Sequence, residues 1–282
     1  MNFNLSIVIC HFLPEHFNGE NPLIKTLDII NRQNKNLNIE IIIADDGSFY
    51  NKEITKSYSG KIEIKDDIRD IYYIEEEKLS DFLNLKNIKN PFIKKWVYLP
   101  KLIKCMAKAK VTNYAVQLSN SDNLLFLDDD NYFISKNSIN EIIDLFKNYD
   151  FIVGQIMDNN NRLRQYKSSR VQGTTIGIKR KIFNNINGFG EWTENFSCGV
   201  DSDFWFKVYK YFQNNNSLKS CYTNKFSTYD SCSKRWKRFT KILQDFKLKK
   251  EFNKIHGCKN YKSKRLNPSR NKKVWIESII EQ

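Results

Sequence analysis

The amino-acid sequence predicts an α/β fold with a largely parallel central sheet. Two runs of consecutive apolar, mostly β-branched residues, at residues 5–10 (LSIVIC) and 39–44 (IEIIIA), are typical of strands buried on both faces. Between them, residues 22–33 have apolar side chains at helical spacing, and Pro22 suits a first helical turn. Strand, helix and strand in this order predict a right-handed βαβ unit.

The alternation of strands and helices continues along the chain, which favours the α/β class throughout. A chain of 282 residues is long enough for one such domain, with or without an appendage. We expect further strands at residues 62–64, 71–74, 123–127, 151–157 and 174–178. We expect helices at residues 99–110, 138–147 and 203–212, and loops at residues 75–77 and 84–91.

The excess positive charge lies in the C-terminal part of the chain. The net charge is +14 at pH 7. Residues 1–203 contain 26 Lys and Arg against 27 Asp and Glu, whereas residues 204–282 contain 20 against 5. This asymmetry predicts a basic appendage with a partner of its own.

Cysteine spacing and hydropathy argue against several classes of protein. The six cysteines form no C-x-x-C pair and do not cluster with the three histidines, which argues against a zinc site and a disulfide framework. The first apolar run is too short for a signal peptide. No stretch approaches the ~20 apolar residues that span a bilayer. We therefore expect a cytoplasmic protein.

Two of the predicted strands end in clusters of aspartates. In open α/β sheets, ligands bind beyond the carboxyl ends of the strands, so parallel strands would bring both clusters to one edge. For either cluster alone, ordinary turn formation is the competing explanation. The acids are Asp45 and Asp46 after the strand at residues 39–44, and Asp128, Asp129 and Asp130 after the strand at residues 123–127.

The second cluster predicts a bound cation. Three adjacent carboxylates resist ionising together unless a cation or hydrogen-bond donors compensate their charge. In an extended chain, Asp128 and Asp130 point to one side and Asp129 to the other. Two carboxylate ligands suit Mg²⁺ or Mn²⁺, which usually complete their coordination with water and a substrate's phosphates.

A third acidic site precedes an aromatic-rich helix. Asp201 and Asp203 follow Gly199 and stand just before this helix. Acids at a helix start are stabilised by the helix dipole, so capping explains one of them. The second acid, beside a glycine that allows close approach, indicates a general base.

Four blocks of the sequence, taken in order, resemble the family 2 glycosyltransferases, which have the GT-A fold and invert the anomeric centre. The blocks cover most of residues 5–210, and the ordered set is more specific than any one block. They are SIVICHF with the helix that follows it, IEIIIADDGS, TNYAVQLSNSDNLLFLDDD, and GTTIGIKRKIFNNINGFGEWTENFSCGVDSDFWFK.

The resemblance implies roles for the acids and for two further side chains. It implies an inverting transfer from a nucleotide sugar, with a UDP-sugar favoured, to an acceptor hydroxyl in surface glycan biosynthesis. It also implies a Mn²⁺ or Mg²⁺ cofactor. The donor contacts would be His11, Asp45, Asp46, Asn113, Asp128 and Asp129; the metal ligands Asp130 and Asp128; the general base Asp201, with Asp203 as the alternate.

The resemblance also suggests a division of the chain. Residues 1–218 would form the GT-A catalytic domain, with a nucleotide-sugar half at about residues 1–130 and an acceptor half at about residues 131–218. Residues 219–282 would form the basic C-terminal extension.

The chain departs from the family pattern in ways that keep rival functions open. Val200 stands where the family usually has Glu, and Thr112 where it often has Arg, for which Lys108 or Lys110 is a candidate substitute. His256 lies too far along to match the family's late histidine. A non-catalytic nucleotide-sugar-binding protein is therefore one alternative. A nucleotidyltransferase is another, but the segment after the first strand lacks a Gly-rich basic loop.

The C-terminal region has an aromatic stripe among basic residues. Residues 233–255 place Trp236, Phe239, Leu243 and Phe246 at helical spacing. This pattern fits a helix packed on the catalytic domain. It also fits peripheral contact with anionic lipid on the inner face of the membrane, near a glycan or lipid-linked acceptor. No recognition motif supports nucleic-acid binding.

Overall fold

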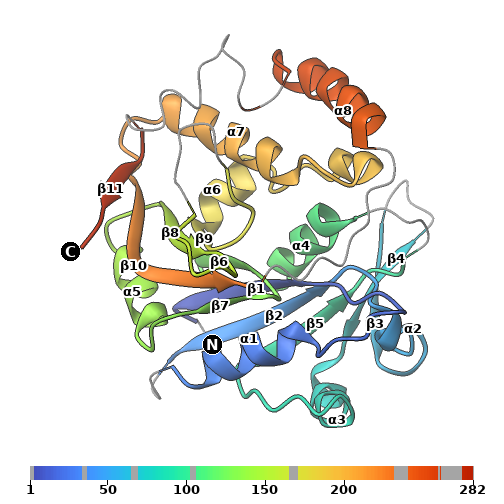
Figure 1. Ribbon diagram of the computed structural model, residues 1–282. Coiled ribbons are helices and arrows are strands. Elements are labelled where there is room, and N and C mark those ends of the chain that lie inside the picture. The colour runs from blue at the N-terminus through green and yellow to red at the C-terminus, as the bar shows by residue number, and fades with distance from the viewer. Residues whose placement is uncertain are drawn as a thin grey trace.

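The computed structural model describes residues 3–33, 37–64, 69–101, 106–164, 171–231, 241–259, 261 and 275–281 (Figure 1). The strands are β1 (Leu5–His11), β2 (Ile39–Asp45), β3 (Ser59–Glu63), β4 (Asp70–Ile74), β5 (Ile93–Tyr98), β6 (Asn123–Asp128), β7 (Asn131–Phe133), β8 (Phe151–Met157), β9 (Ile176–Lys179), β10 (Ser220–Asp230) and β11 (Glu277–Ile279). The α-helices are α1 (Pro22–Asn31), α2 (Ile54–Ser57), α3 (Glu76–Leu85), α4 (Lys108–Gln117), α5 (Ser138–Leu145), α6 (Arg180–Asn185), α7 (Val200–Gln213) and α8 (Lys241–His256). Two 3-10 helices, η1 (Phe49–Asn51) and η2 (Glu191–Phe196), complete the set.

The described strands form one mixed, mostly parallel sheet in the order β11-β10-β8-β9-β6-β1-β2-β5-β4-β3, with β7 paired to β10. At its centre, β1 lies between β2 and β6 and runs parallel to both. The antiparallel pairs are β9 with its neighbours β6 and β8, β3 with β4, β4 with β5, and β7 with β10. This arrangement confirms the predicted α/β class with a largely parallel sheet.

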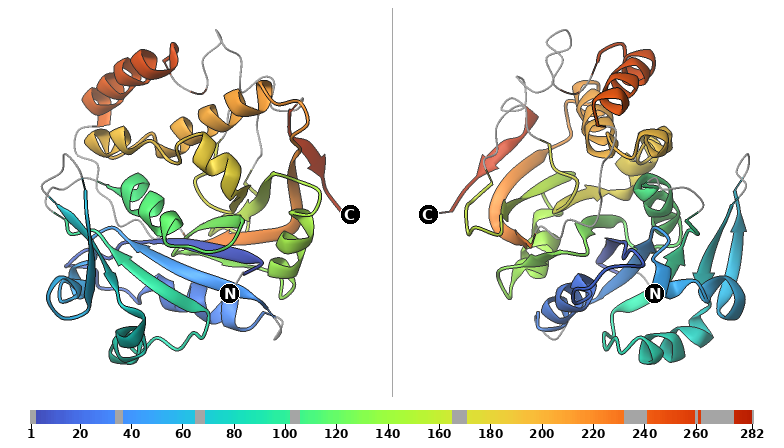
Figure 2. Two further views of the ribbon diagram at one scale, coloured as in Figure 1. Left: turned by 180° about the vertical axis from the view of Figure 1, so that it is seen from behind. Right: turned by 45° about the vertical axis from the view of Figure 1, so that its right-hand side comes forward.

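Helices cover both faces of the sheet, as Figures 1 and 2 show. Helices α1, α3 and α5 pack on one face, and α4, α6 and α7 on the other. Successive residues of β1 point to opposite faces of the sheet. Ile7 and Ile9 therefore pack in the core on the side of α1, α3 and α5, and Val8 packs in the core on the side of α4, α6 and α7. Burial of both faces explains why the central strands are continuously apolar.

The N-terminal βαβ unit follows its sequence signals closely. The side chain of Asn21 accepts a hydrogen bond from the backbone N–H of Leu23, and Pro22 occupies the first turn of α1. Leu23, Leu27 and Ile30 are buried against the sheet, as their spacing predicted. The helix therefore returns the chain to β2, which pairs in parallel with β1.

Two predictions between residues 75 and 117 were wrong. Helix α3 includes residues 76–77 and 84–85, which were predicted to lie in two loops; its first turn carries two glutamates, and its apolar side chains Leu79, Phe82 and Leu83 are buried. Most residues of this helix are polar and exposed, so the helical spacing of its few apolar residues was not recognised in the sequence. The helix predicted at residues 99–110 instead begins at Lys108 and runs to Gln117. Residues 102–105 lie outside the described part of the chain.

The basic C-terminal segment contributes to the fold. Strand β10 pairs in parallel with β8, so residues 220–230 belong to the central sheet although they fall within the predicted extension. Helix α8 lies over α7 (Figure 2), where Phe252 and His256 are buried against Phe206. No helix among the described residues has the length and hydropathy to span a bilayer.

The predicted aromatic stripe is only partly visible. Trp236 and Phe239 lie outside the described residues, as does the side chain of Leu243. Phe246 is 70% exposed and points away from the core. Among the described side chains of α8, Phe252 and His256 are buried, whereas Phe246 is presented to solvent.

Candidate functional site

The acid-bearing strand ends lie side by side. In the parallel register of the sheet, His11 is paired with Asp45 and Cys10 with Asp128. The clusters after β2 and β6 therefore meet at one edge, on either side of the end of β1. This confirms the prediction that parallel strands bring both clusters together.

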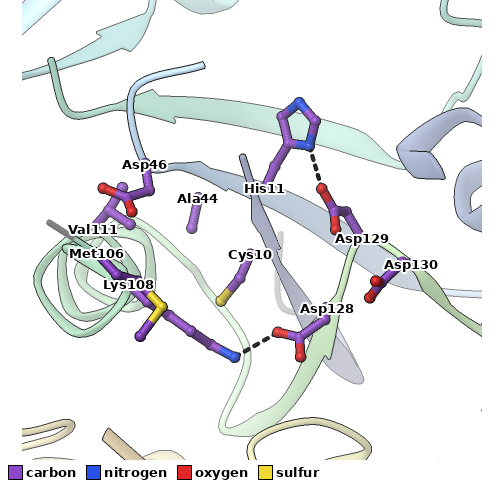
Figure 3. Close-up of a pocket in the computed structure, with 10 residues that line it drawn as sticks. All are labelled: Cys10, His11, Ala44, Asp46, Met106, Lys108, Val111, Asp128, Asp129 and Asp130. Atoms are coloured by element: carbon purple, nitrogen blue, oxygen red, sulfur yellow. Dashed lines mark hydrogen bonds and ion pairs between the residues drawn. The ribbon is translucent and has the colours of Figure 1, made fainter. Parts of the chain in front are cut away.

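A pocket of about 220 Å³ opens at this edge (Figure 3). Strands β1, β2 and β6 form its floor, and the start of α4 forms one wall. It is lined by Cys10, His11, Ala44, Asp46, Met106, Lys108, Val111, Asp128, Asp129 and Asp130. Five of the seven predicted donor and metal residues thus line one cavity, whereas Asp45 and Asn113 do not, and neither does the predicted base Asp201.

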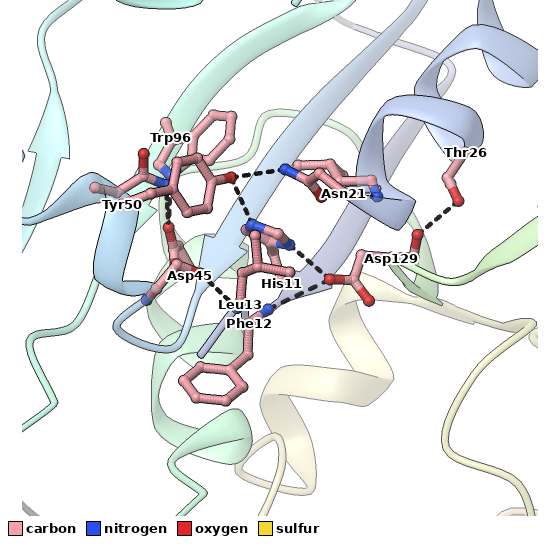
Figure 4. Close-up of polar contacts among 12 residues, drawn as sticks. His11, Phe12, Leu13, Asn21, Thr26, Asp45, Tyr50, Trp96 and Asp129 are labelled. Carbon is pink, nitrogen blue, oxygen red and sulfur yellow. Dashed lines mark hydrogen bonds and ion pairs between the residues drawn. The ribbon is translucent and has the colours of Figure 1, made fainter. Parts of the chain in front are cut away.

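Asp45 organises the turn after β2. Its carboxylate is fully buried and accepts hydrogen bonds from the backbone N–H of Ser48 at 2.7 Å and the Asn51 amide at 2.7 Å. The indole N–H of Trp96 donates to it at 3.2 Å (Figure 4). With these donors in place, Asp45 holds the turn in shape while its neighbour faces the cavity.

Asp46 is the carboxylate of this turn that faces the pocket. Its Oδ2 accepts hydrogen bonds from the backbone N–H of Ala107 at 3.0 Å and pairs with the Lys101 ammonium at 2.5 Å. Its Oδ1 is buried and has no hydrogen-bond partner among the described residues. Burial raises the pKa of Asp46 to about 6 against the opposing effect of Lys101. An unpartnered buried acceptor at a pocket wall is suited to a ligand's N–H or O–H.

His11 and Asp129, which both line the pocket, belong to a buried hydrogen-bond network (Figure 4). His11 Nδ1 lies 2.6 Å from Asp129 Oδ2, and His11 Nε2 lies 2.6 Å from the Tyr50 hydroxyl. The Asn21 amide donates to the same hydroxyl, and Thr26 donates to the backbone carbonyl of Asp129. This network ties β1 and α1 to the turn after β6. It holds Asp129, and both ring nitrogens of His11 are occupied by hydrogen-bond partners within the protein.

Lys108 reaches from the first turn of α4 to Asp128, as Figure 3 shows. Its ammonium nitrogen lies 2.5 Å from Asp128 Oδ1 and donates to the carbonyl of Gly173 at 3.3 Å. Burial by itself would lower the pKa of Lys108, but Asp128 and Asp201 outweigh it, so that pKa is raised. Burial likewise raises the pKa of the neighbouring Cys10 thiol to about 11, which keeps it protonated at neutral pH.

Of the two predicted metal ligands, Asp128 and Asp130, the first already has a cationic partner. Asp130 lines the pocket, and its backbone carbonyl accepts a hydrogen bond from the backbone N–H of Ser231. Asp128 is already neutralised by Lys108. Among the described residues, no three His, Cys, Asp or Glu side chains gather as a metal site. A cation bound to Asp128 would lie against the Lys108 ammonium, so these residues do not fit the predicted two-aspartate site.

Asp201 lies in the first turn of α7, on the side of the pocket where Lys108 meets Gly173. A Cβ at Gly173 would lie 2.1 Å from Asp201 Oδ1, so this glycine makes room for the carboxylate. Asp201 is close enough to Lys108 and Asp128 to shift the pKa of both. The sequence carries no local signal for this role of Gly173, because its contact with Asp201 depends on tertiary packing.

Asp203, the alternate base, is bound by side chains of the protein itself. It is 1% exposed and bonds His256 Nε2 at 2.7 Å and the indole N–H of Trp192 at 3.1 Å. Its other oxygen lies 3.2 Å from the Lys207 ammonium. Burial alone would raise the pKa of Asp203, but His256 and Lys207 overcome it and lower that pKa. The carboxylate thus joins α7 to η2 and α8.

Asn113 holds the acceptor-side turn. Its amide donates to the carbonyl of Phe189 and to Glu191, both at 2.9 Å, and its carbonyl accepts from the backbone N–H of Phe189. A Cβ at Gly188 would lie 2.5 Å from Asn113 Oδ1. The structure therefore places Asn113 between α4 and the turn before η2, outside the ten residues that line the pocket.

No protein-family model matches the chain, and no curated protein matches its sequence. Solved structures match its fold. Residues 1–349 of S. aureus TarS in complex with UDP-GlcNAc show 13% identity and a TM-score of 0.50, over 84% of this chain and 60% of that one. The mannosyltransferase PcManGT from Pyrobaculum calidifontis, in complex with GDP-Man and Mn²⁺, shows 12% identity and a TM-score of 0.53, over 90% and 64%.

The chain spans less than two thirds of the length of these two solved chains, at 60% and 64%. At such identities the likeness concerns the fold. In common with those glycosyltransferases, the chain has a mixed, mostly parallel sheet flanked by helices, which is the GT-A type of fold.

Proposed function

We propose that the protein is an inverting glycosyltransferase that moves a sugar from a nucleotide sugar, with a UDP-sugar favoured, to an acceptor hydroxyl. The observation that carries this proposal is the pocket where the ends of β1, β2 and β6 meet, with Asp201 near both Lys108 and Asp128. The two structural neighbours are complexes with UDP-GlcNAc and GDP-Man, which supports a nucleotide-sugar donor.

Asp46 is suited to the nucleobase. A uracil or guanine edge presents N–H donors, and Asp46 Oδ1 is a buried acceptor without a partner among the described residues. Supplying that partner would recover the cost of its burial. Asp45 and the His11–Asp129 pair hold the strand ends that place Asp46 and Asp128 around the donor.

Replacing Asp46 with Ala is expected to weaken binding of UDP by about 10-fold, because a charge-assisted hydrogen bond is lost. With the pKa of Asp46 at about 6, wild-type affinity should also fall as the pH is lowered from 7 to 5, since the protonated acid is a poorer acceptor. Calorimetry with UDP and GDP measures both effects. Unchanged affinity in the folded variant would remove Asp46 from the binding site.

Transfer would proceed by a single displacement. Asp201 takes the proton of the acceptor hydroxyl, whose oxygen bonds to the anomeric carbon as the bond from that carbon to the diphosphate oxygen breaks. The electron pair leaves with the nucleoside diphosphate. Attack from the face opposite the diphosphate inverts the anomeric centre. Gly173 contributes by leaving space for the Asp201 carboxylate.

A non-catalytic nucleotide-sugar-binding protein is the second candidate, because of Val200. This residue occupies the first position of α7, is 2% exposed, and packs in the core where the family usually has an acid. Incubation with UDP-GlcNAc and candidate acceptors, followed by assay of released UDP, separates the two functions. Donor binding with neither transfer nor hydrolysis would favour the binding protein.

The exposed face of α8 is suited to an anionic surface. Phe246 is 70% exposed and Ile255 45%, and exposed lysines surround them: Lys247, Lys249, Lys250 and Lys254. Basic side chains beside exposed apolar ones are typical of interfacial helices. We therefore propose peripheral attachment to the inner face of a membrane, near a glycan or lipid-linked acceptor.

The full chain is expected to co-sediment with phosphatidylserine-containing liposomes at low salt and to be released at 1 M salt, because the Debye length falls from about 10 Å at 0.1 M to about 3 Å at 1 M. Each lysine near the surface contributes about 1 kcal/mol. Replacing Lys247, Lys250 and Lys254 together with Gln should abolish sedimentation, whereas the same changes at Lys136, Lys147 and Lys181 should not. Absence of wild-type sedimentation at low salt would contradict membrane attachment.

A further inference from the structure

The ten residues that line the pocket include four aspartates and one lysine, Lys108, whose side chain is positively charged at neutral pH. Three of those acids have a cationic or imidazole partner: Asp46 has Lys101, Asp129 has His11, and Asp128 has Lys108. A nucleoside diphosphate adds further negative charge to this cavity. Binding it requires positive charge at the pocket wall, where Lys108 lies.

Lys108 occupies a costly position that the fold alone does not require. Its side chain is 15% exposed, and it stands in the first turn of α4, where the helix dipole disfavours a cation. Its ion pair with Asp128, whose side chain is 32% exposed, is partly buried and contributes little net stability compared with apolar residues of similar size. A side chain held there at such cost indicates a functional role.

The ammonium group retains a donor for a ligand. Within the described part of the chain, two acceptors take its hydrogens, Asp128 Oδ1 at 2.5 Å and the carbonyl of Gly173 at 3.3 Å. An ammonium has three hydrogens. It lies beside the donor-side acid Asp128, and through Gly173 it lies near the proposed base Asp201, so the leaving diphosphate would lie within its reach.

We infer that Lys108 binds the diphosphate of the donor and stabilises the charge that develops as it leaves, in place of a divalent metal at Asp128 and Asp130. This inference rests on the proposed glycosyltransferase function. Asp128 then serves to hold the ammonium, and donor binding does not depend on Mn²⁺ or Mg²⁺. The departing diphosphate oxygen takes the electron pair, and the fixed ammonium lowers the cost of that charge.

Calorimetry of the full chain with UDP and with GDP, in EDTA and again in Mn²⁺, tests the inference. For the nucleotide that binds more tightly, we expect wild-type dissociation constants in the two buffers to agree within about 3-fold. Lys108→Met should bind about 10- to 100-fold more weakly in EDTA, the range for one charge-assisted hydrogen bond. Lys108→Arg, which keeps the charge, should recover most of the affinity.

Lys110→Met is the matched control. Lys110 lies on the same helix, is 12% exposed, and is ion-paired with Glu194 away from the pocket lining. It should bind the nucleotide as the wild type does. If wild-type binding is lost in EDTA and restored by Mn²⁺, the inference about Lys108 is wrong while the glycosyltransferase proposal stands. If neither nucleotide binds in either buffer, both are wrong. The wild-type comparison decides the question even if Lys108→Met fails to fold.

Discussion

Replacing Asp201 with Asn is expected to lower the transfer rate by about 10²-fold or more, while the affinity for the donor stays within a few-fold of wild type. Asn keeps the shape of the side chain and most of its hydrogen bonding, but it cannot accept the acceptor's proton. The position suits this role because Gly173 leaves space for the carboxylate and Lys108 lies nearby. Single-turnover assays of UDP release, with calorimetry for donor affinity, separate the two quantities.

Asp203→Asn is the control for this experiment. Asp203 is buried and bonded to His256 and Trp192, so its loss should lower stability more than it lowers the rate of the folded fraction. If Asp203→Asn instead slows transfer in a fully folded protein and Asp201→Asn is mild, the base has been assigned to the wrong acid.

The sequence predicted that the two aspartate clusters meet at one sheet edge, because the signal for each strand end is local. Apolar runs that end in Asp45 and in Asp128 identify strands and their carboxyl ends, and parallel pairing then brings the ends together. The fold class depends on the same runs. The missed helix α3 shows the limit of this approach, since three buried side chains, Leu79, Phe82 and Leu83, were outweighed by polar neighbours.

The contacts that each aspartate makes could not be predicted from its position in a motif. Asp45 and Asp46 are adjacent, yet the first is saturated by donors of its own turn and the second faces the pocket with an unpartnered oxygen. Asp203 and His256 are 53 residues apart and meet only because α8 folds back on α7. Lys108 similarly reaches Asp128 across the sheet edge. Such pairings depend on tertiary packing, which local periodicity does not encode.

Replacing Asp203 with Ala is expected to destabilise the protein by about 3–5 kcal/mol, the range for removing one partner of a buried charged pair. The change would leave His256, which is 7% exposed, and the indole N–H of the partly exposed Trp192 without the acceptor they share. It would also loosen the contact between α7 and α8. Urea denaturation followed by circular dichroism measures the loss. Asp144→Ala is the matched control, because its pair with Lys147 is exposed and should contribute no more than about 1 kcal/mol.

The pH dependence of the stability difference between wild type and Asp203→Asn distinguishes a charged pair from simple packing. Because His256 and Lys207 lower the pKa of Asp203 in the folded state, its ionisation contributes stability above the unfolded pKa, which is about 3.9. That contribution is lost as the pH falls through the lower, folded value. The stability difference between wild type and Asp203→Asn should therefore be constant from pH 7 to about pH 5 as far as Asp203 itself is concerned, and shrink below about pH 4. A difference that is unchanged at pH 3 in a still-folded protein would show that Asp203 acts through packing, and that α8 is held on α7 mainly by Phe252 and Phe206.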